Sequence, residues 1–423
     1  MRTPLLFLAL ATILTTSASF AQDKPLKARP DAFAPEEQTI ESKAVAMAST
    51  VDEMSQWDRY PTYQTYLDMM KGFADEFPNL CHIDTIGTSV QGRLILCARI
   101  QHHDSYQNPH PEFFYSSTMH GDEVTGYVMM LRLIDTLLHG YGSNQQYTDL
   151  INTVDIYINP LSNPDGTYRG GNSTVRYAQR YNANYVDLNR NYPDPFGTAP
   201  LNSQQQENTA MIDYVSNHHF RLSANLHGGS EVMNYPWDSF TSAENPHPDS
   251  EWWQAVCKRF VDTSRTYNNS IFRDVNTAGY IAGGDWYVIP NGRQDYMNYY
   301  HNCREMTMEI SSNKTVDSGQ LPGYWQSLQH ALVNYIAEIH NLPSSTEAVE
   351  TPRMNASLRC FPNPTRDRLF LSEESASDIF IFNTMGKCVL HLPKGTRTID
   401  LHTLPHGIYM VRCGSHATKV VKQ

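Results

Sequence analysis

The sequence predicts an α/β domain with a central sheet flanked by helices, followed by a small C-terminal all-β, sandwich-like domain. Strand-like and helix-like stretches alternate from about residue 60 to residue 340. Beyond that region the strand-like segments are short and separated by turn residues. With 423 residues, of which 40% are hydrophobic, the chain is long enough for two or three domains with a large core.

Apolar patterning defines the elements of the α/β domain. Short apolar segments rich in β-formers predict buried strands at 94–100, 111–118, 153–160, 220–227 and 305–311. Helical spacing of apolar residues predicts helices at 126–141, 207–219, 248–267 and 324–341. In the C-terminal region, strands are predicted at 368–371, 378–383, 388–392, 398–401 and 407–413.

The segments outside these elements predict how the chain is divided. Residues 1–21 combine Arg2, an apolar run and small residues, which is typical of a cleavable secretory signal. The polar, proline-containing residues 22–54 suit a spacer or pro-segment, and 342–352 form a Pro/Ser/Thr/Glu linker. The expected domains are therefore 55–341 and 353–423.

Charge and hydropathy limit the classes of function that the chain can have. The formal net charge of −12 argues against a nucleic-acid partner and mildly favours cationic ligands. After the signal segment, no run approaches the roughly 18 apolar residues needed to cross a bilayer. We expect a mature protein that is soluble or attached to a surface.

The seven cysteines are compatible with disulfides in an exported chain, although their odd number leaves at least one unpaired. Cys81 with Cys97, and Cys257 with Cys303, are two hypothetical pairs. The absence of C-x-x-C argues against a structural zinc ribbon.

Polar side chains follow three of the predicted strands. His120 and Glu123 lie in the stretch MHGDEVTG after 111–118, His227 ends 220–227, and Glu309 lies within 305–311. Open α/β sheets bind ligands beyond the carboxyl ends of their strands. His120, Glu123 and His227 would form a His2Glu set for one zinc ion. The alternative for His227 is a capping or core histidine.

The stretch RYNANYVDLNRNYPD (180–194) concentrates Arg180, Asn189 and Arg190 in one polar loop. A guanidinium and an amide suit a bidentate contact with a carboxylate. A surface loop with salt bridges would explain this stretch equally well on its own.

These residues carry a resemblance to the zinc metallocarboxypeptidases, and within them to the subgroup of carboxypeptidases D, E and N. The chain resembles that subgroup from about residue 60 to 340, which implies a mixed central sheet flanked by helices. The matching pieces, in the family's order, are HGDE, NPDG, RYNANYVDLNRN, SANLHGGSEVMNYPWD, WYVIPNGRQDY and NCREMTMEIS.

The resemblance assigns a role to each candidate residue. It implies zinc ligation by His120, Glu123 and His227, with Asp187 as a partner of His120. It implies that Glu309 is the general base and that Arg180 stabilises the oxyanion. The residues implied to hold the substrate's terminal carboxylate are Asn189, Arg190 and the mobile Tyr287.

Two further positions concern the substrate's last side chain. Asp238 matches the acid that the subgroup places opposite that side chain, and Gln294 matches its helper, which implies selection of Lys or Arg. Without the resemblance, Asp238 would be interpreted as the start of a turn. Asp122 departs from the usual HGNE and adds negative charge beside the metal.

The C-terminal region does not match the transthyretin-like domain usual in that subgroup. Its pieces CFPNPTRDRLFL, DIFIFNTMGKCVLHL and IDLHTLPHGIYMVRC resemble the sorting domain of the bacterial type IX secretion system. This resemblance implies a secretion-machinery partner and export through the periplasm to the cell surface or medium. A simple accessory β-module is the alternative.

The leading hypothesis is an exported zinc carboxypeptidase that acts on peptide or protein C-termini, with Lys or Arg as the expected last residue. Its rivals are a carboxypeptidase of another terminal specificity, a cell-wall peptide hydrolase, and a non-catalytic surface binder.

Overall fold

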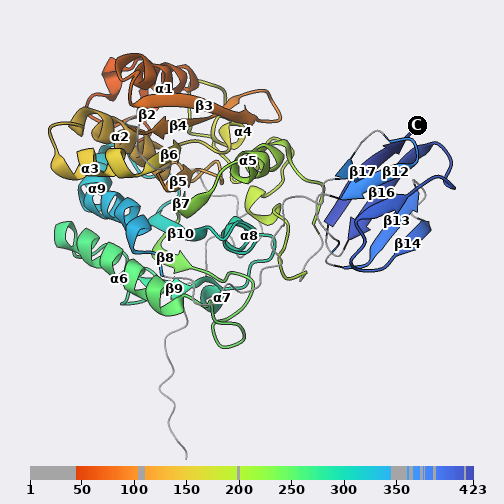
Figure 1. Ribbon diagram of the computed structural model, residues 1–423. Coiled ribbons are helices and arrows are strands. Elements are labelled where there is room, and N and C mark those ends of the chain that lie inside the picture. Colours follow the sequence, from red (N-terminus) through yellow and green to blue (C-terminus); the bar gives the residue numbers. More distant parts are fainter. Residues whose placement is uncertain are drawn as a thin grey trace, which may run out of the picture.

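The computed structural model (Figure 1) describes residues 44–102, 110–197, 201–343, 360–361, 365–371, 375, 377–383, 387–413 and 416–423. The predicted signal segment, residues 22–43 of the predicted spacer and almost all of the predicted linker lie outside these ranges.

A mixed sheet of eight strands forms the centre of the larger domain. In spatial order it contains β3 (Cys81–Thr88), β4 (Leu94–Ile100), β6 (Asp155–Asn159), β5 (Glu112–Ser117), β7 (Phe220–His227), β10 (Arg304–Ser311), β8 (Ser230–Tyr235) and β9 (Tyr280–Ala282). The four strands from β6 to β10 run parallel to one another, whereas β3, β4 and β8 pair antiparallel with β4, β6 and β10.

Helices cover both faces of this sheet (Figure 1). One layer contains α1 (Tyr63–Glu76), α2 (Thr125–Gly140), α3 (Gln145–Thr153), α6 (Ser250–Tyr267) and α9 (Leu321–Ala337). The other face packs against α5 (Gln206–Ser216) and α8 (Arg293–Tyr300). The short elements are η1 (Asp52–Met54), α4 (Pro164–Thr167), η2 (Leu188–Arg190), α7 (Gly283–Trp286), η3 (Ser318–Gln320) and η4 (Glu338–Asn341).

The alternation of side chains along the strands produces these two layers. In β5, Phe113 and Tyr115 enter the large core with α1, α2, α6 and α9, while Phe114 enters the smaller core with α5 and α8. A strand buried on both faces needs a continuous apolar run, and β5 has one.

The strands predicted in this domain are confirmed as β4, β5, β6, β7 and β10, and the predicted helices as α2, α5, α6 and α9. The sheet is mixed and flanked by helices, as expected. Sequence patterning did not identify α1, α3, α8, β8 or β9.

The last part of the predicted spacer packs against the sheet domain. The strand β1 (Met47–Ala48) pairs in parallel with β2 (Tyr60–Pro61), and Ala48 is fully buried. The backbone N–H of Ala44 donates to Asp317 Oδ1 at 2.9 Å. These contacts join residues 44–48 to the turn before α9.

The two hypothetical disulfides are wrong, because Cys81, Cys97, Cys257 and Cys303 are free thiols. Cys81 pairs in register with Ile100, and Cys97 pairs with Asp84, so the two cysteines do not face each other across the hairpin. The Sγ atom of Cys257 lies 4.0 Å from Met306 Sδ. Cys303 instead donates to Ser223 Oγ at 3.2 Å.

The C-terminal residues form two antiparallel sheets around their own apolar core. One sheet contains β11 (Cys360–Phe361), β12 (Arg368–Leu371) and β15 (Thr398–Asp400). The other contains β13 (Ile379–Asn383), β14 (Cys388–Leu392), β16 (Gly407–Cys413) and β17 (His416–Lys422). Leu369, Ile399, Ile381 and Val411 from the two sheets are all fully buried in that core. The predicted small all-β domain is confirmed.

Among the described residues, no helix has both the length and the apolar character needed to span a membrane.

Candidate active site

Three neighbouring parallel strands bring the predicted residues to one edge of the sheet. Strand β7 lies between β5 and β10, with Leu226 in register with Ser117 and His227 in register with Glu309. His120 follows β5 by one short turn. The strand-end side chains therefore converge as the sequence predicted.

The turn after β5 depends on a tight backbone path. Thr118 adopts a positive φ of 61°, and its hydroxyl donates to the backbone oxygen of Glu123 at 3.2 Å. A Cβ atom on Gly121 would lie 2.6 Å from the Gln179 oxygen and 2.4 Å from the carbonyl carbon of Gly166. Only glycine permits this approach, which places His120 and Glu123 on the same side of the turn.

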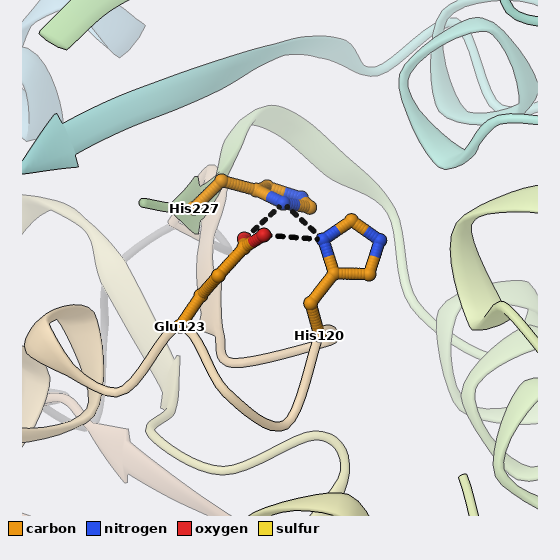
Figure 2. Close-up of side chains that lie close together, drawn as sticks. All are labelled: His120, Glu123 and His227. Carbon is orange, nitrogen blue, oxygen red and sulfur yellow. Dashed lines mark hydrogen bonds and ion pairs between the residues drawn. The ribbon is translucent and has the colours of Figure 1, made fainter. Parts of the chain in front are cut away.

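His120, Glu123 and His227 form a compact, buried group (Figure 2). His120 Nδ1 lies 3.0 Å from Glu123 Oε1 and 3.0 Å from His227 Nδ1. His227 Nδ1 lies 2.8 Å from Glu123 Oε2. One donor atom from each residue lies within 4.8 Å of the others, so the group could hold a metal ion.

The chemistry of this donor set fits zinc. Two imidazole nitrogens and one carboxylate are a recurrent catalytic set that keeps a coordination position for water or substrate. Burial alone would raise the pKa of Glu123, but the imidazoles of His120 and His227 outweigh it and hold that pKa well below its ordinary range. Glu123 is therefore an ionised carboxylate beside two nitrogen donors.

Asp187 fixes the orientation of His120. Its Oδ1 atom lies 3.2 Å from His120 Nε2, the nitrogen directed away from the other two donors. Arg180 donates to Asp187 Oδ2 from Nε at 3.0 Å and Nη2 at 2.8 Å. Burial would raise the pKa of Asp187, yet Arg180 and His120 hold it well below its ordinary range. An anionic partner of this kind makes an imidazole a better ligand.

Arg180 connects this partner to the donor set. Its Nη1 atom lies 3.0 Å from His120 Nδ1 and 3.6 Å from Glu123 Oε1. Nη1 of the guanidinium therefore lies beside the donor set, while Nε and Nη2 are occupied by Asp187.

Asn189 and Arg190 lie in η2, directly after Asp187. Asp187 Oδ1 accepts the backbone N–H of Asn189 at 2.8 Å, so the same carboxylate orients both the imidazole and this turn. Asn189 Oδ1 accepts the backbone N–H of Arg293 at 2.9 Å, and Arg190 Nη1 donates to the backbone carbonyl oxygen of Asn189 at 2.8 Å.

A second buried acid lies near Asn189. Asp238 is 1% exposed, and its Oδ1 accepts a hydrogen bond from Gln294 Nε2 at 3.0 Å. A Cβ atom added to Gly292 would lie 3.7 Å from both Asp238 Oδ2 and Asn189 Oδ1. Asn189, Asp238 and Gln294 therefore surround one small region.

Glu309 and Tyr287 occupy different environments. Glu309 is 4% exposed and pairs in register with His227 on the adjacent strand. Tyr287 directly follows α7 and is half-buried, with its ring centroid 6.0 Å from that of Trp286. Tyr287 also packs against the small apolar cluster of Val232, Val275 and Trp286, and its role in closing over a substrate stays a prediction.

Two charged residues in this region were not predicted from the sequence. Lys314 Nζ lies 3.2 Å from Asp122 Oδ2 and 3.9 Å from Glu123 Oε1. Asp295 is fully buried and accepts backbone hydrogen bonds from the Asp238 turn. Their proximity in sequence to Glu309 and Gln294 is the signal that could have identified them.

A buried His2Glu set with a further glutamate on the adjacent strand is the arrangement of a metal-dependent hydrolase. The pattern of the zinc carboxypeptidase family matches residues 66–331, and that of the secretion system C-terminal sorting domain matches residues 359–423. The chain belongs to the zinc carboxypeptidase family and carries a secretion sorting domain after the family region.

Curated relatives agree with this family. Carboxypeptidase D of Mus musculus is 32% identical over 293 residues, which cover 66% of this chain and 21% of the relative. The carboxypeptidase N catalytic chain of Homo sapiens is 32% identical over 322 residues, which cover 67% of this chain and 69% of the relative. This chain thus spans about a fifth of the length of the carboxypeptidase D relatives it matches.

A solved structure supports the fold. Thrombin-activatable fibrinolysis inhibitor superposes with a TM-score of 0.59 at 16% identity, covering 68% of this chain and 76% of that one. The predicted class, a zinc metallocarboxypeptidase fold followed by a sorting domain, is confirmed.

Proposed function

We propose that this protein is an exported, zinc-dependent metallocarboxypeptidase that removes a C-terminal Lys or Arg from peptides and proteins. The observation that carries the specificity is the buried Asp238 carboxylate, held by Gln294 in the region that also contains Asn189. An acid in such a position favours a cationic side chain.

The proposed ligands are His120, Glu123 and His227, with one zinc ion per chain. When bound, zinc polarises the scissile carbonyl and lowers the pKa of the attacking water. The Glu309 carboxylate accepts the proton of that water and returns it to the leaving amine nitrogen. The Arg180 guanidinium stabilises the oxyanion that develops on the former carbonyl oxygen.

Restriction to the last residue follows from the groups proposed to bind a free carboxylate. The Asn189 amide and the Arg190 guanidinium offer donors suited to a bidentate contact, and Tyr287 would close over the bound end. A chain that continues past this point has no carboxylate to present. The enzyme would therefore release one residue at a time.

Export is proposed from the C-terminal domain. The match of residues 359–423 to a secretion system sorting domain supports a partner in the secretion machinery. The amino-terminal segment 1–21 has the composition of a secretory signal, which would bring the chain to the periplasm first. The final location would be the cell surface or the medium.

The test uses two peptides that differ only in ending with Arg or Leu. We expect release of Arg, its loss on treatment with a chelator, and its recovery when zinc is returned. Asp238→Asn should reduce kcat/KM for the Arg peptide by about 100-fold, because one partner of a buried charge pair is removed. It should have a much smaller effect on the Leu peptide.

Each other outcome excludes a part of the proposal. Preferential release of Leu would retain the mechanism and remove the role of Asp238. Release that resists both chelator and Glu309→Gln would contradict the mechanism. No release from either peptide, with zinc bound, would favour a non-catalytic binder.

A further inference from the structure

A second buried carboxylate supports the turn that carries Asp238. Asp295 lies in the first turn of α8 and is completely buried. Its Oδ1 accepts the backbone N–H of Asp238 at 2.8 Å, and its Oδ2 accepts the backbone N–H of Ser239 at 2.8 Å. Both oxygens are therefore used to hold the backbone of residues 238–239 in place.

Two consecutive residues of α8 act on Asp238 in different ways. Gln294 donates to the side-chain oxygen Oδ1 of Asp238, whereas Asp295 binds its backbone. Gln294 is itself oriented by the backbone N–H of Thr307 in β10, which donates to Gln294 Oε1 at 2.7 Å. The acid is thus positioned from β10 through α8, in addition to its own turn.

The charge of Asp295 also acts on this region. Burial raises its pKa to about 7, and the nearby Asp238 carboxylate adds to that shift, while bonds from the 238–239 turn oppose it. The adjacent Arg293 is directed elsewhere, since its Nη2 donates to Glu305 Oε2 at 3.1 Å. Burial and the neighbouring Asp238 carboxylate therefore both disfavour a negative charge on Asp295 unless a cation arrives.

We propose that Asp295 is a positioning and specificity-determining residue for basic substrates. It fixes the Asp238 carboxylate through the backbone of residues 238–239, so that this carboxylate faces the Lys or Arg side chain. This inference rests on the proposed function, because it assigns Asp238 to the substrate's terminal side chain. The inference adds Asp295 to the residues that determine specificity, and Asp295 does so by positioning Asp238.

The test is a double-mutant cycle with Asp238→Asn, Asp295→Asn and the combined variant, measured on the Arg and Leu peptides. Asn at position 295 removes the charge and cannot accept both backbone hydrogen bonds. We expect KM for the Arg peptide to rise about tenfold with a much smaller change in kcat, as when substrate binding rather than the reacting centre is altered. The combined variant should lose no more Arg preference than Asp238→Asn alone.

A matched control and a second substitution keep the test decisive. Asp285 is exposed near the same region and also accepts an N–H and an O–H, both from Ser242. Asp285→Asn should leave the Arg preference intact. Zinc content and the thermal midpoint would show that each variant is folded. If Asp295→Asn does not fold, the smaller Asp295→Ser replaces it in the cycle.

The outcomes distinguish a failure of the role of Asp295 from a failure of the proposed function. If Asp238→Asn abolishes the Arg preference while the Asp295 variant retains it within twofold, the role of Asp295 is wrong and the function stands. Losses that add in the combined variant would likewise contradict action through Asp238. A wild-type enzyme without Arg preference would overturn the proposed specificity itself.

Discussion

At the residue scale, the orientation of each side chain determines which atom is available for chemistry. His120 directs Nδ1 toward Glu123 and His227, and its other nitrogen is occupied by Asp187. Asp187 in turn is held by Arg180 and orients the Asn189 turn. One carboxylate thus links the predicted metal ligand to the predicted binding site of the substrate carboxylate.

The role proposed for Glu309 gives the sharpest prediction at this scale. Glu309→Gln keeps the size of the side chain but cannot accept the proton of the attacking water. We expect kcat to fall by about 1,000-fold, as for loss of a positioned general base. The bound zinc, measured by elemental analysis, should be unchanged because Glu309 is not among the proposed ligands.

Glu251→Gln is the control for this substitution, because Glu251 lies exposed in the first turn of α6. It should retain the wild-type rate. A Glu309→Gln enzyme within tenfold of wild type, or one that has lost its zinc, would refute the assignment of Glu309 as a base that does not ligate the metal.

Lys314 compensates the charge that Asp122 introduces beside the proposed metal ligands. Both side chains are largely buried, and burial of Lys314, which alone would lower its pKa, is outweighed by Asp122 and Glu123. Lys314→Met would leave Asp122 buried next to Glu123 without this cation. We expect the free energy of unfolding to fall by about 3 kcal/mol, measured by denaturant titration.

An exposed lysine provides the comparison. Lys258 pairs with Asp262 four residues later on the surface of α6, and both side chains are more than half exposed. Lys258→Met should leave the denaturation midpoint unchanged, since such pairs add little. Equal effects of the two substitutions would mean that the Lys314 pair is no more important than a surface pair.

At the scale of elements, α7 must begin with a residue that has no side chain. A Cβ atom on Gly283 would lie 1.8 Å from Asp238 Oδ1 and 2.6 Å from Asn234 Oδ1. Gly283→Ala should therefore displace Asp238, raise KM for the Arg peptide, and cost about 2 kcal/mol of stability through overpacking. Peptide kinetics and the thermal midpoint would measure both effects.

Gly319, in η3, has no heavy atom within 4 Å of an added Cβ. Gly319→Ala should leave kinetics and stability near wild type. If Gly283→Ala behaves in the same way, the close approach of α7 to Asp238 does not shape the pocket.

The elements also show how far sequence patterns can predict. Strand β5 has three consecutive apolar residues, β7 and β10 have apolar residues at alternate positions, and polar side chains follow or end all three. Both the strands and the convergence of His120, His227 and Glu309 could therefore be predicted. For Asn189 and Arg190 the loop composition indicated a carboxylate site and a surface loop equally well, and the resemblance favoured the first. The roles expected for Asp238 and Gln294 came from the resemblance, without which Asp238 would be the start of a turn.

The missed elements have a physical explanation. Helix α8 is written RQDYMNYY, and its buried residues include Arg293, Gln294 and Asp295. These polar side chains are buried because Glu305, Asp238 and backbone groups from distant segments provide their partners. Hydrophobic periodicity cannot detect a helix whose inner face is polar, and this is where Asp295 lies.

At the scale of the whole molecule, the sheet domain and the C-terminal domain have separate cores. The apolar clusters of the sheet domain draw only on residues up to 342, and that of the C-terminal domain only on residues from 360 onward. Two cores without shared members can fold independently.

A shortened chain tests this independence. All six tryptophans lie between residues 57 and 325, so intrinsic fluorescence reports unfolding of the sheet domain alone. A protein ending at residue 343 should unfold with a free energy within about 0.5 kcal/mol of the full chain and retain its kcat/KM. A shift of several kcal/mol would show that the C-terminal domain stabilises the enzyme.

The central position of β7 has a consequence for how the protein acquires its metal. His120 and Glu123 are three residues apart, but His227 is 104 residues from Glu123 and reaches it only when β7 lies between β5 and β10. An emerging or unfolded chain therefore offers two weak donors, and tight capture of the ion must wait for the middle strand to be inserted. The rate of metal uptake during refolding would therefore report the rate at which the sheet is completed.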